Sequence, residues 1–253
     1  MFDVEVVAIV AVAFLVAGFV KGVVGLGLPV ISIAILSATV GLKAAVALFL
    51  VPAMVTNIWQ ALTGGNLFTL VRRLWPLLIT AIGGIWIGVK ILVAADVNLI
   101  ATALGVVLVV YALLGLFQAR MPKPGSWEPW LTPVIGAMGG VMFGMMGNFM
   151  VPGVLYIQSL GLPRDMFVQA LGLTFLIISS TLAIVLSRHA LMPIETAMLS
   201  AGALIPTMVG MFLGQKIRRL LSEAQFARVV FVAIGLSGVY MIVRAFFASG
   251  LLG

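Results

Sequence analysis

The second half of this chain repeats the first half in weaker form. Gly18-x3-Gly22-x2-Gly25-x3-Pro29 returns as Gly140-x3-Gly144-x2-Gly147-x4-Pro152, 122 residues later (140 − 18). Gly84-x3-Gly88-x-Lys90 returns as Gly210-x3-Gly214-x-Lys216, 126 residues later (210 − 84). In a membrane chain, a duplication with a Gly/Pro break at the same point of each half is typical of transporters and indicates where the substrate binds.

Composition places the chain in the membrane. The sequence is 63% hydrophobic and 8% charged, with a mean hydropathy of +1.30, whereas soluble domains carry about 25% charged residues. We expect an all-α integral membrane bundle. The pI near 10.4 does not indicate nucleic-acid binding, because the basic residues are spread over loops and helix ends. The chain has no cysteine, which excludes disulfides and thiolate metal sites.

The apolar stretches divide into five segments per half. In the first repeat (residues 1–120) we place them at 4–22, 29–40, 43–63, 72–93 and 97–119. After an inter-repeat loop at 121–130, the second repeat (131–253) has them at 131–146, 151–162, 166–188, 195–216 and 223–247. The second and seventh segments have about 12 residues and reach about 18 Å, against a hydrocarbon core of about 30 Å. They either re-enter the membrane or cross it obliquely, and both repeats form one membrane domain.

An odd number of crossings per half predicts an inverted repeat. With the N-terminus outside, ten basic residues fall on inside loops: Lys21, Arg72, Arg73, Arg120, Lys123, Arg164, Lys216, Arg218, Arg219 and Arg228. Four fall outside: Lys43, Lys90, Arg188 and Arg244. This asymmetry follows the positive-inside rule. It predicts a multi-pass protein of the inner (plasma) membrane with both termini outside the cytoplasm.

The two Gly/Pro breaks are the first candidates for a binding site. Gly25 and Gly27 precede Pro29, and Gly147 precedes Pro152. Proline suits the first turn of a helix, so each break predicts unwound chain leading into a helix that begins inside the membrane. The free N–H groups of such a helix start favour an anion. The alternative is close packing, because Gly18/Gly22 and Gly140/Gly144 have the GxxxG spacing of helix interfaces.

Polar residues inside the apolar segments are the second set of candidates. Asn57 and Gln60 form a stripe with Thr56 and Thr63 on the third segment, Asn148 lies in the second break, and Thr174 lies on the eighth segment with Gln169, Ser179, Ser180 and Thr181. They either line a substrate path or bond between helices. Lys21, inside the first glycine run, either neutralises an anion or extends to the surface.

The sequence offers no enzymatic chemistry. His189 is the only histidine, and Asp96, Asp165, Glu195 and Glu223 fall at predicted helix starts, where acidic residues cap. No serine-hydrolase, zinc-protease or phosphate-loop motif occurs. We therefore expect no enzyme activity, cofactor or metal. The absence of a carboxylate in the middle of a segment also removes the usual site of proton or sodium coupling.

The motifs resemble a known family. The run GFVKGVVGLGLPVISIAIL, followed by VGLKAAVALFLVPAMVTNIWQA, is similar to the TauE/SafE-type sulfite exporters, also called toluene-sulfonate uptake permeases. The matching positions are Gly22, Gly25, Gly27, Pro29, Ala44 and Asn57, then Gly144, Gly147, Pro152, Ala170 and Thr174. The chain departs from the pattern at Asn148-Phe149, which replaces the second glycine of the Gly25/Gly27 pair. The resemblance implies transport of sulfur-containing anions such as sulfite or organosulfonates.

These inferences lead to one functional hypothesis. We expect a transporter in which a small anion binds near the midplane between the breaks, walled by the third and eighth segments, with export by alternating access. The expected partners are the anion and the lipid bilayer, without nucleic acid, and the sequence leaves a homodimer open. The alternatives are an uptake permease or anion channel on the same scaffold, and a membrane scaffold that transports nothing.

Overall fold

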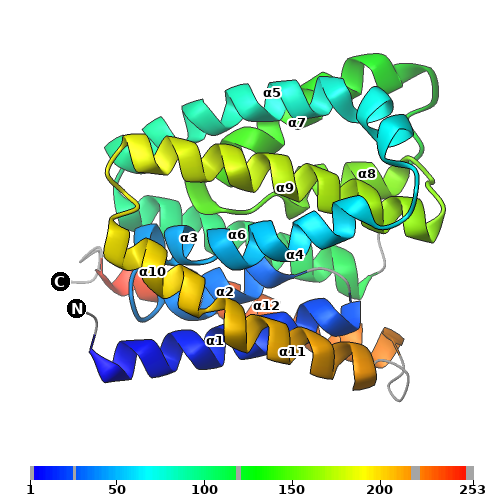
Figure 1. Ribbon diagram of the computed structural model, residues 1–253. Helices are drawn as coiled ribbons and strands as arrows, with labels where there is room; N and C mark the ends of the chain where they lie inside the picture. Colours follow the sequence, from blue (N-terminus) through cyan, green and yellow to red (C-terminus); the bar gives the residue numbers. More distant parts are fainter. Residues whose placement is uncertain (1–2, 25–26, 118–120, 218–222, 249–253) are drawn as a thin grey trace. The chain divides into compact units, whose positions relative to one another are not determined.

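The computed structural model describes residues 3–24, 27–117, 121–217 and 223–248, which are helical apart from short connections (Figure 1). In chain order the elements are α1 (Val4–Val24), α2 (Leu28–Ser37), α3 (Leu42–Leu48), α4 (Leu50–Leu62), α5 (Leu67–Ala94), α6 (Val97–Leu116), η1 (Gly125–Trp127), α7 (Glu128–Met146), η2 (Met150–Val154), α8 (Leu155–Ser159), α9 (Arg164–Arg188), α10 (Ile194–Gly202), α11 (Leu204–Ile217) and α12 (Glu223–Ala248). No strand occurs among the described residues, so the all-α prediction is confirmed.

Each predicted apolar segment contains helix. Eight stretches of the described chain are long and apolar enough to cross a membrane: 4–23, 42–62, 67–94, 97–116, 125–146, 165–188, 194–217 and 228–245. The third and ninth predicted segments are each divided into two helices, at Phe49 and at Ala203. Helices α2, with 10 residues, and α8, with 5, are shorter than the roughly 20 residues of a helix that spans the membrane by itself, so each crosses only together with neighbouring chain or re-enters. The chain is a multi-pass membrane protein.

The helices belong to two compact units, and each unit draws on both halves of the sequence. Unit 1 contains the described residues within 1–52, 95–119 and 190–253, and unit 2 those within 53–94 and 120–189. Unit 1 therefore holds α1, α2, α3, α6, α10, α11 and α12, together with the first turn of α4. Unit 2 holds the rest of α4 with α5, α7, η2, α8 and α9.

In unit 1, α1 and α11 pack backbone against backbone. A Cβ atom added at Gly18 would collide with the carbonyl of Thr207, and one at Gly22 with the carbonyl of Met211. Reciprocally, α11 places Gly210 and Gly214 against carbonyls of α1. The residue numbers of the contacts on α11 rise as those on α1 rise, so the two helices run parallel. Only glycine allows this approach.

The α6–α12 pair of unit 1 has the opposite sense. Gly105 of α6 lies against Gly238 of α12, whereas Gly115 lies against the ring of Phe231. Residue numbers rise along α6 while they fall along α12, so these helices run antiparallel. Both contacts again place a glycine where a side chain would collide.

Unit 2 repeats the glycine packing with α5 and α7, which run side by side in Figure 1. Gly84 and Gly88 lie against the carbonyls of Ala137 and Val141, in parallel register. A bidentate ion pair joins the same helices where α7 begins, with Arg73 Nε 2.7 Å from Glu128 Oε1 and Arg73 Nη2 2.9 Å from Glu128 Oε2. Close packing therefore accounts for Gly84 and Gly88, as it does for Gly18 and Gly22.

Neighbouring glycines on α5 provide a test of this packing. A Cβ at Gly84 would overlap the backbone of α7, whereas a Cβ at Gly83 would have nothing within 4 Å. We predict that Gly84→Ala destabilises the protein by about 1–3 kcal/mol, the usual cost of overpacking. Gly83→Ala is expected to be neutral or to stabilise by up to about 1 kcal/mol, because alanine is the better helix former. Thermal unfolding of the purified variants in detergent measures both, and equal midpoints would contradict the packing role.

Candidate functional site

The first break lies in unit 1 and is shorter than its glycine motif. Helix α1 continues through Gly22 to Val24, and Gly25 lies outside the described residues. Gly27 adopts a φ of 104° at the N-cap of α2, a conformation that side chains disfavour, and Pro29 lies in the first turn. The prediction that proline starts a short helix is confirmed here. The predicted unwound chain at Gly25 lies outside the described residues, and helix extends to Val24 before it.

Lys21 is therefore a helical residue. It occupies the last turn of α1, within the predicted segment 4–22. Its side chain is only 7% exposed within the protein. The lysine side chain is buried within unit 1, on the helix whose glycines pack against α11.

The second break lies in unit 2 and is organised around Asn148. Gly147 ends α7 in the left-handed conformation, with φ 71°. The Asn148 Oδ1 atom then accepts the backbone N–H of Met150 at 2.8 Å, which fixes the side chain over the turn. The other amide atom, Nδ2, is buried and has no hydrogen-bond partner among the described residues. The second break therefore holds one buried donor that its fold does not use.

Regular helix resumes later here than the sequence predicts. The predicted segment 151–162 begins instead with the π-helical turn η2, inside which Val151 is extended (φ −116°, ψ 122°). Pro152 lies within this turn, and α8 begins only at Leu155 and ends at Ser159. Pro152 does not start a regular helix as Pro29 does, so the two breaks differ in detail.

Three phenylalanines connect the second break to α9. Phe149 contacts Phe143 of α7 and Phe175 of α9, and Phe143 contacts Phe175, with ring centroids 6.1–6.4 Å apart and edge-to-face geometry. Gly139 and Gly153 leave the space that the Phe149 ring occupies. The sequence analysis missed this cluster. The only sign of it in the sequence is that Phe149, after Asn148, occupies the position that corresponds to Gly27 of the first break.

Helix α9 carries two kinds of buried polar residue. The Gln169 side chain is satisfied at both ends: its Nε2 donates to Ala61 O at 2.9 Å, and its Oε1 accepts from Asn66 N at 3.0 Å. Thr174 is fully buried, and its hydroxyl has no partner among the described residues. Ser179 is in the same condition. Thr174 directly precedes Phe175, whose ring contacts Phe149 of the second break.

Helix α4 completes this neighbourhood of unit 2. Gly172 of α9 lies against Gln60 and Ala61, and Asn57 is buried one turn earlier on α4. The two hydroxyls of the predicted polar stripe differ from its two amides. The Thr56 and Thr63 hydroxyls donate to backbone carbonyls of their own helix, Ala53 O and Trp59 O. Unit 2 thus contains the predicted residues Asn57, Gln60, Gly147, Asn148, Pro152 and Thr174. Unit 1 contains Lys21, Gly27 and Pro29.

The site's chemistry is that of neutral donors. Amide and hydroxyl groups bind an oxyanion through N–H and O–H donation without a buried permanent charge. Within the described residues no group of three or more His, Asp or Glu side chains is placed to hold a metal ion. In unit 2, Asn148 and Thr174 are the predicted residues that bring such neutral groups without a partner among the described residues.

A fold of many apolar helices with interrupted segments defines a class, the polytopic helical membrane proteins. Over residues 10–241 the chain matches the family described as Sulfite exporter TauE/SafE, and it belongs to that family. Neither a curated protein nor a solved structure matches it. Membership of this family makes the chain a transmembrane transporter, and it indicates that the transported substrates are sulfur anions.

Two buried polar residues of α9, one hydrogen-bonded and one without a partner among the described residues, allow a test of what these hydrogen bonds contribute to stability. Gln169→Leu removes two hydrogen bonds and leaves backbone groups of Ala61 and Asn66 without partners, so we predict a loss of about 1–3 kcal/mol in stability. Thr174→Val keeps the shape and removes a hydroxyl that bonds to nothing, so we predict no loss or a gain. Chemical or thermal unfolding in detergent measures both. A Thr174→Val protein as destabilised as Gln169→Leu would show that the hydroxyl has a structural partner.

Proposed function

We propose that this protein exports small sulfur-containing anions, such as sulfite or an organosulfonate, by alternating access. The observation that carries the proposal is the family match over residues 10–241. The second break supports it independently, because Asn148 Nδ2 and Thr174 Oγ1 are buried donors without a partner among the described residues. An unsatisfied buried donor costs about 1–3 kcal/mol, and a bound oxyanion offsets this cost.

The donor set suits a sulfur oxyanion. Sulfite and sulfonate groups present several oxygen acceptors and no hydrogen-bond donor when ionised, so they match amide N–H and hydroxyl groups. Hydrogen bonds to a charged acceptor are about twice as strong as those between neutral groups. Asn57 and Gln60 on α4 extend the same amide chemistry within unit 2.

The driving force in this proposal is the membrane potential. No Asp or Glu lies in the middle of an apolar segment of the sequence, so the proposal contains no carboxylate for proton coupling. An inside-negative potential favours the exit of an anion by about 2.3 kcal/mol per charge per 100 mV. We further propose that the two compact units, rather than the two sequence halves, are the bodies that move during alternating access. Each packs through its own glycine contacts.

Helix directions support an inverted repeat. The final helices of the two halves, α6 and α12, run antiparallel in unit 1. Repeats with the same orientation would give these two equivalent helices the same direction. In the repeat, α1 corresponds to α7 and α5 corresponds to α11. The two parallel pairs, α1–α11 and α5–α7, are therefore equivalent to each other, and they are compatible with repeats of either orientation. On this basis the short helices count as crossings, and both termini lie outside the cytoplasm.

Cysteine labelling tests the topology directly, because the natural sequence has no thiol. Lys123 and Glu195 are exposed on the loops before α7 and at the start of α10. Three crossings between them, made by α7, η2 with α8, and α9, predict opposite sides of the membrane. An impermeant maleimide added to intact cells should label Glu195→Cys and leave Lys123→Cys unlabelled until the cells are opened. Labelling of both variants from outside would mean an even number of crossings between Lys123 and Glu195, which would reject the inverted repeat.

A flux assay tests the site and the driving force together. In proteoliposomes, sulfite flux is expected to follow an imposed potential and to persist without a pH gradient. Thr174→Val and Asn148→Asp should weaken apparent substrate affinity by about 10- to 100-fold, the value of a lost hydrogen bond to a charged group. Asn148→Asp keeps the acceptor for Met150 N–H and adds a negative charge that repels the anion.

The matched control for this assay is Thr181→Val, on the same helix. The Thr181 hydroxyl bonds back to Ile177 O at 2.9 Å, so its loss should leave flux unchanged. Wild-type affinity in both site variants would reject the binding role of the second break. Stimulation of flux by substrate on the far side distinguishes a carrier from a channel. Flux that collapses with the pH gradient and ignores the potential would reject the uniport mechanism.

A further inference from the structure

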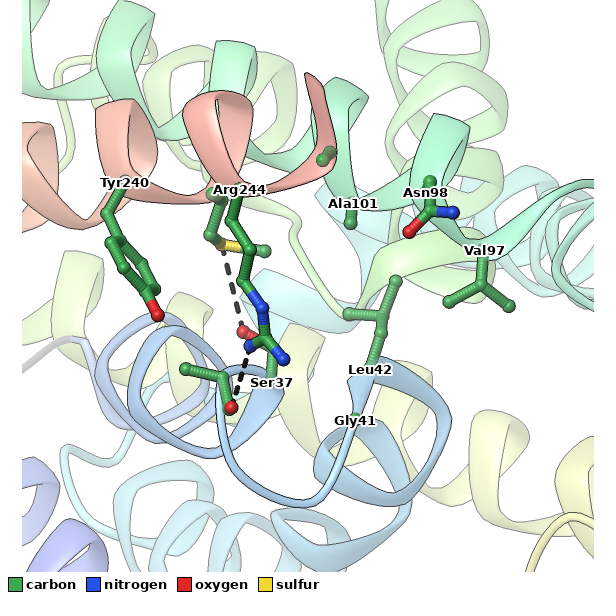
Figure 2. A pocket seen from close by; sticks show the side chains of 11 residues that line it. Ser37, Gly41, Leu42, Val97, Asn98, Ala101, Tyr240 and Arg244 are labelled. Carbon is green, nitrogen blue, oxygen red and sulfur yellow. Dashed lines mark hydrogen bonds between the residues drawn. The ribbon is translucent and has the colours of Figure 1, made fainter. Parts of the chain in front are cut away.

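Unit 1 contains a cavity of about 210 Å³ that lies apart from both breaks in the sequence. It opens where the turn from α2 to α3 meets the first turns of α6 and the last turns of α12 (Figure 2). Helices α6 and α12 are both candidate membrane spans. The ends of spanning helices lie at the level of the lipid headgroups, so we expect the cavity at that depth.

Arg244 of α12 provides the charge of the cavity. Its Nη1 donates to the carbonyl of Ala38, the C-cap residue of α2, at 2.7 Å, and Figure 2 shows the guanidinium directed from α12 toward this turn. Guanidinium has five N–H donors in a planar fork. This single bond is the one that Arg244 makes with the described residues, and no carboxylate lines the cavity.

The other lining groups suit the same ligand. Tyr240, one turn before Arg244, and Asn98 of α6 bring a phenol and an amide to the cavity. The remaining lining is mostly apolar or small, with Ala101 at its α6 wall (Figure 2). A cation with two neutral polar groups, set in an apolar wall at headgroup depth, matches a phosphate oxyanion attached to an apolar tail.

We propose that this cavity is a binding site for the phosphate of an anionic phospholipid. The phosphate oxygens accept hydrogen bonds from Arg244, and Asn98 and Tyr240 flank it. The volume accommodates a headgroup, while the acyl chains stay in the bilayer. A lipid bound here ties α2, α6 and α12 together at one end of unit 1. The proposal stands on the cavity alone and does not depend on which anion the protein transports.

Ligand-induced thermal shifts of the purified full chain in detergent test the proposal. The probes are short-chain phosphatidylglycerol and, at matched ionic strength, inorganic phosphate. At about ten times its dissociation constant the lipid should raise the wild-type midpoint by about 3–6 °C, and inorganic phosphate should not. Arg244→Gln should abolish most of the shift. Because it also weakens the contact with Ala38, the comparison uses each variant's own lipid-free midpoint.

A second variant keeps Arg244 and fills the cavity. Ala101→Leu leaves the bond to Ala38 in place and should remove the lipid shift, whereas Arg72→Gln, an exposed arginine of unit 2, should keep it. Equal shifts in wild type, Arg244→Gln and Ala101→Leu would overturn the site. A full shift with inorganic phosphate, lost in both cavity variants, would overturn the lipid as occupant and assign the cavity to a free oxyanion.

Discussion

Backbone contact between helices at paired glycines is the interaction on which both units depend. Inside a bilayer the helices gain little from burying apolar surface against each other, because lipid tails are equally apolar. Close approach of backbones replaces that gain, and it needs glycine on the contacting face. On α1 and α7 the second glycine of each pair, Gly22 or Gly144, lies two residues before the helix ends at Val24 or Met146. The packing therefore fixes where each break begins, and so where Lys21 and Asn148 lie.

Much of the helical framework was predictable from the sequence, because apolar runs and Gly/Pro punctuation are local signals. The short α2, with Pro29 in its first turn, and the long helices were placed within a few residues. The pairing of α1 with α11 was not predictable. A GxxxG spacing shows that a helix has an interface, but it does not identify the partner, and here the partner lies in the other half of the chain. The regrouping into two units follows from these partners and was equally hidden.

The sequence identified which polar residues lie in the apolar helices, but not which of them are hydrogen-bonded within the protein. Thr56, Thr63 and Thr174 are all threonines in apolar helices, yet the first two bond back to their own helix and the third does not. For Gln169 the sequence left open a substrate path or a bond between helices, and the fold shows the second: it ties α9 to the end of α4 and the following turn. Whether a buried polar group is satisfied depends on neighbours distant in sequence, and only the folded chain brings those neighbours to it.

The two halves share their packing and differ in their chemistry, and the reason is physical. A glycine that faces a carbonyl cannot become any other residue without moving the helix, so Gly18 and Gly22 have counterparts in Gly140 and Gly144. Positions beside these glycines carry no such constraint. Lys21, a buried lysine, corresponds to Phe143, which joins the aromatic cluster at the second break. Where the first half has Gly27, the second half has Phe149, preceded by Asn148. These two residues provide an aromatic ring and an amide donor. Burying a second lysine would also add a second desolvation cost. Packing therefore keeps the glycines alike in both halves, whereas the polar groups beside them are free to differ.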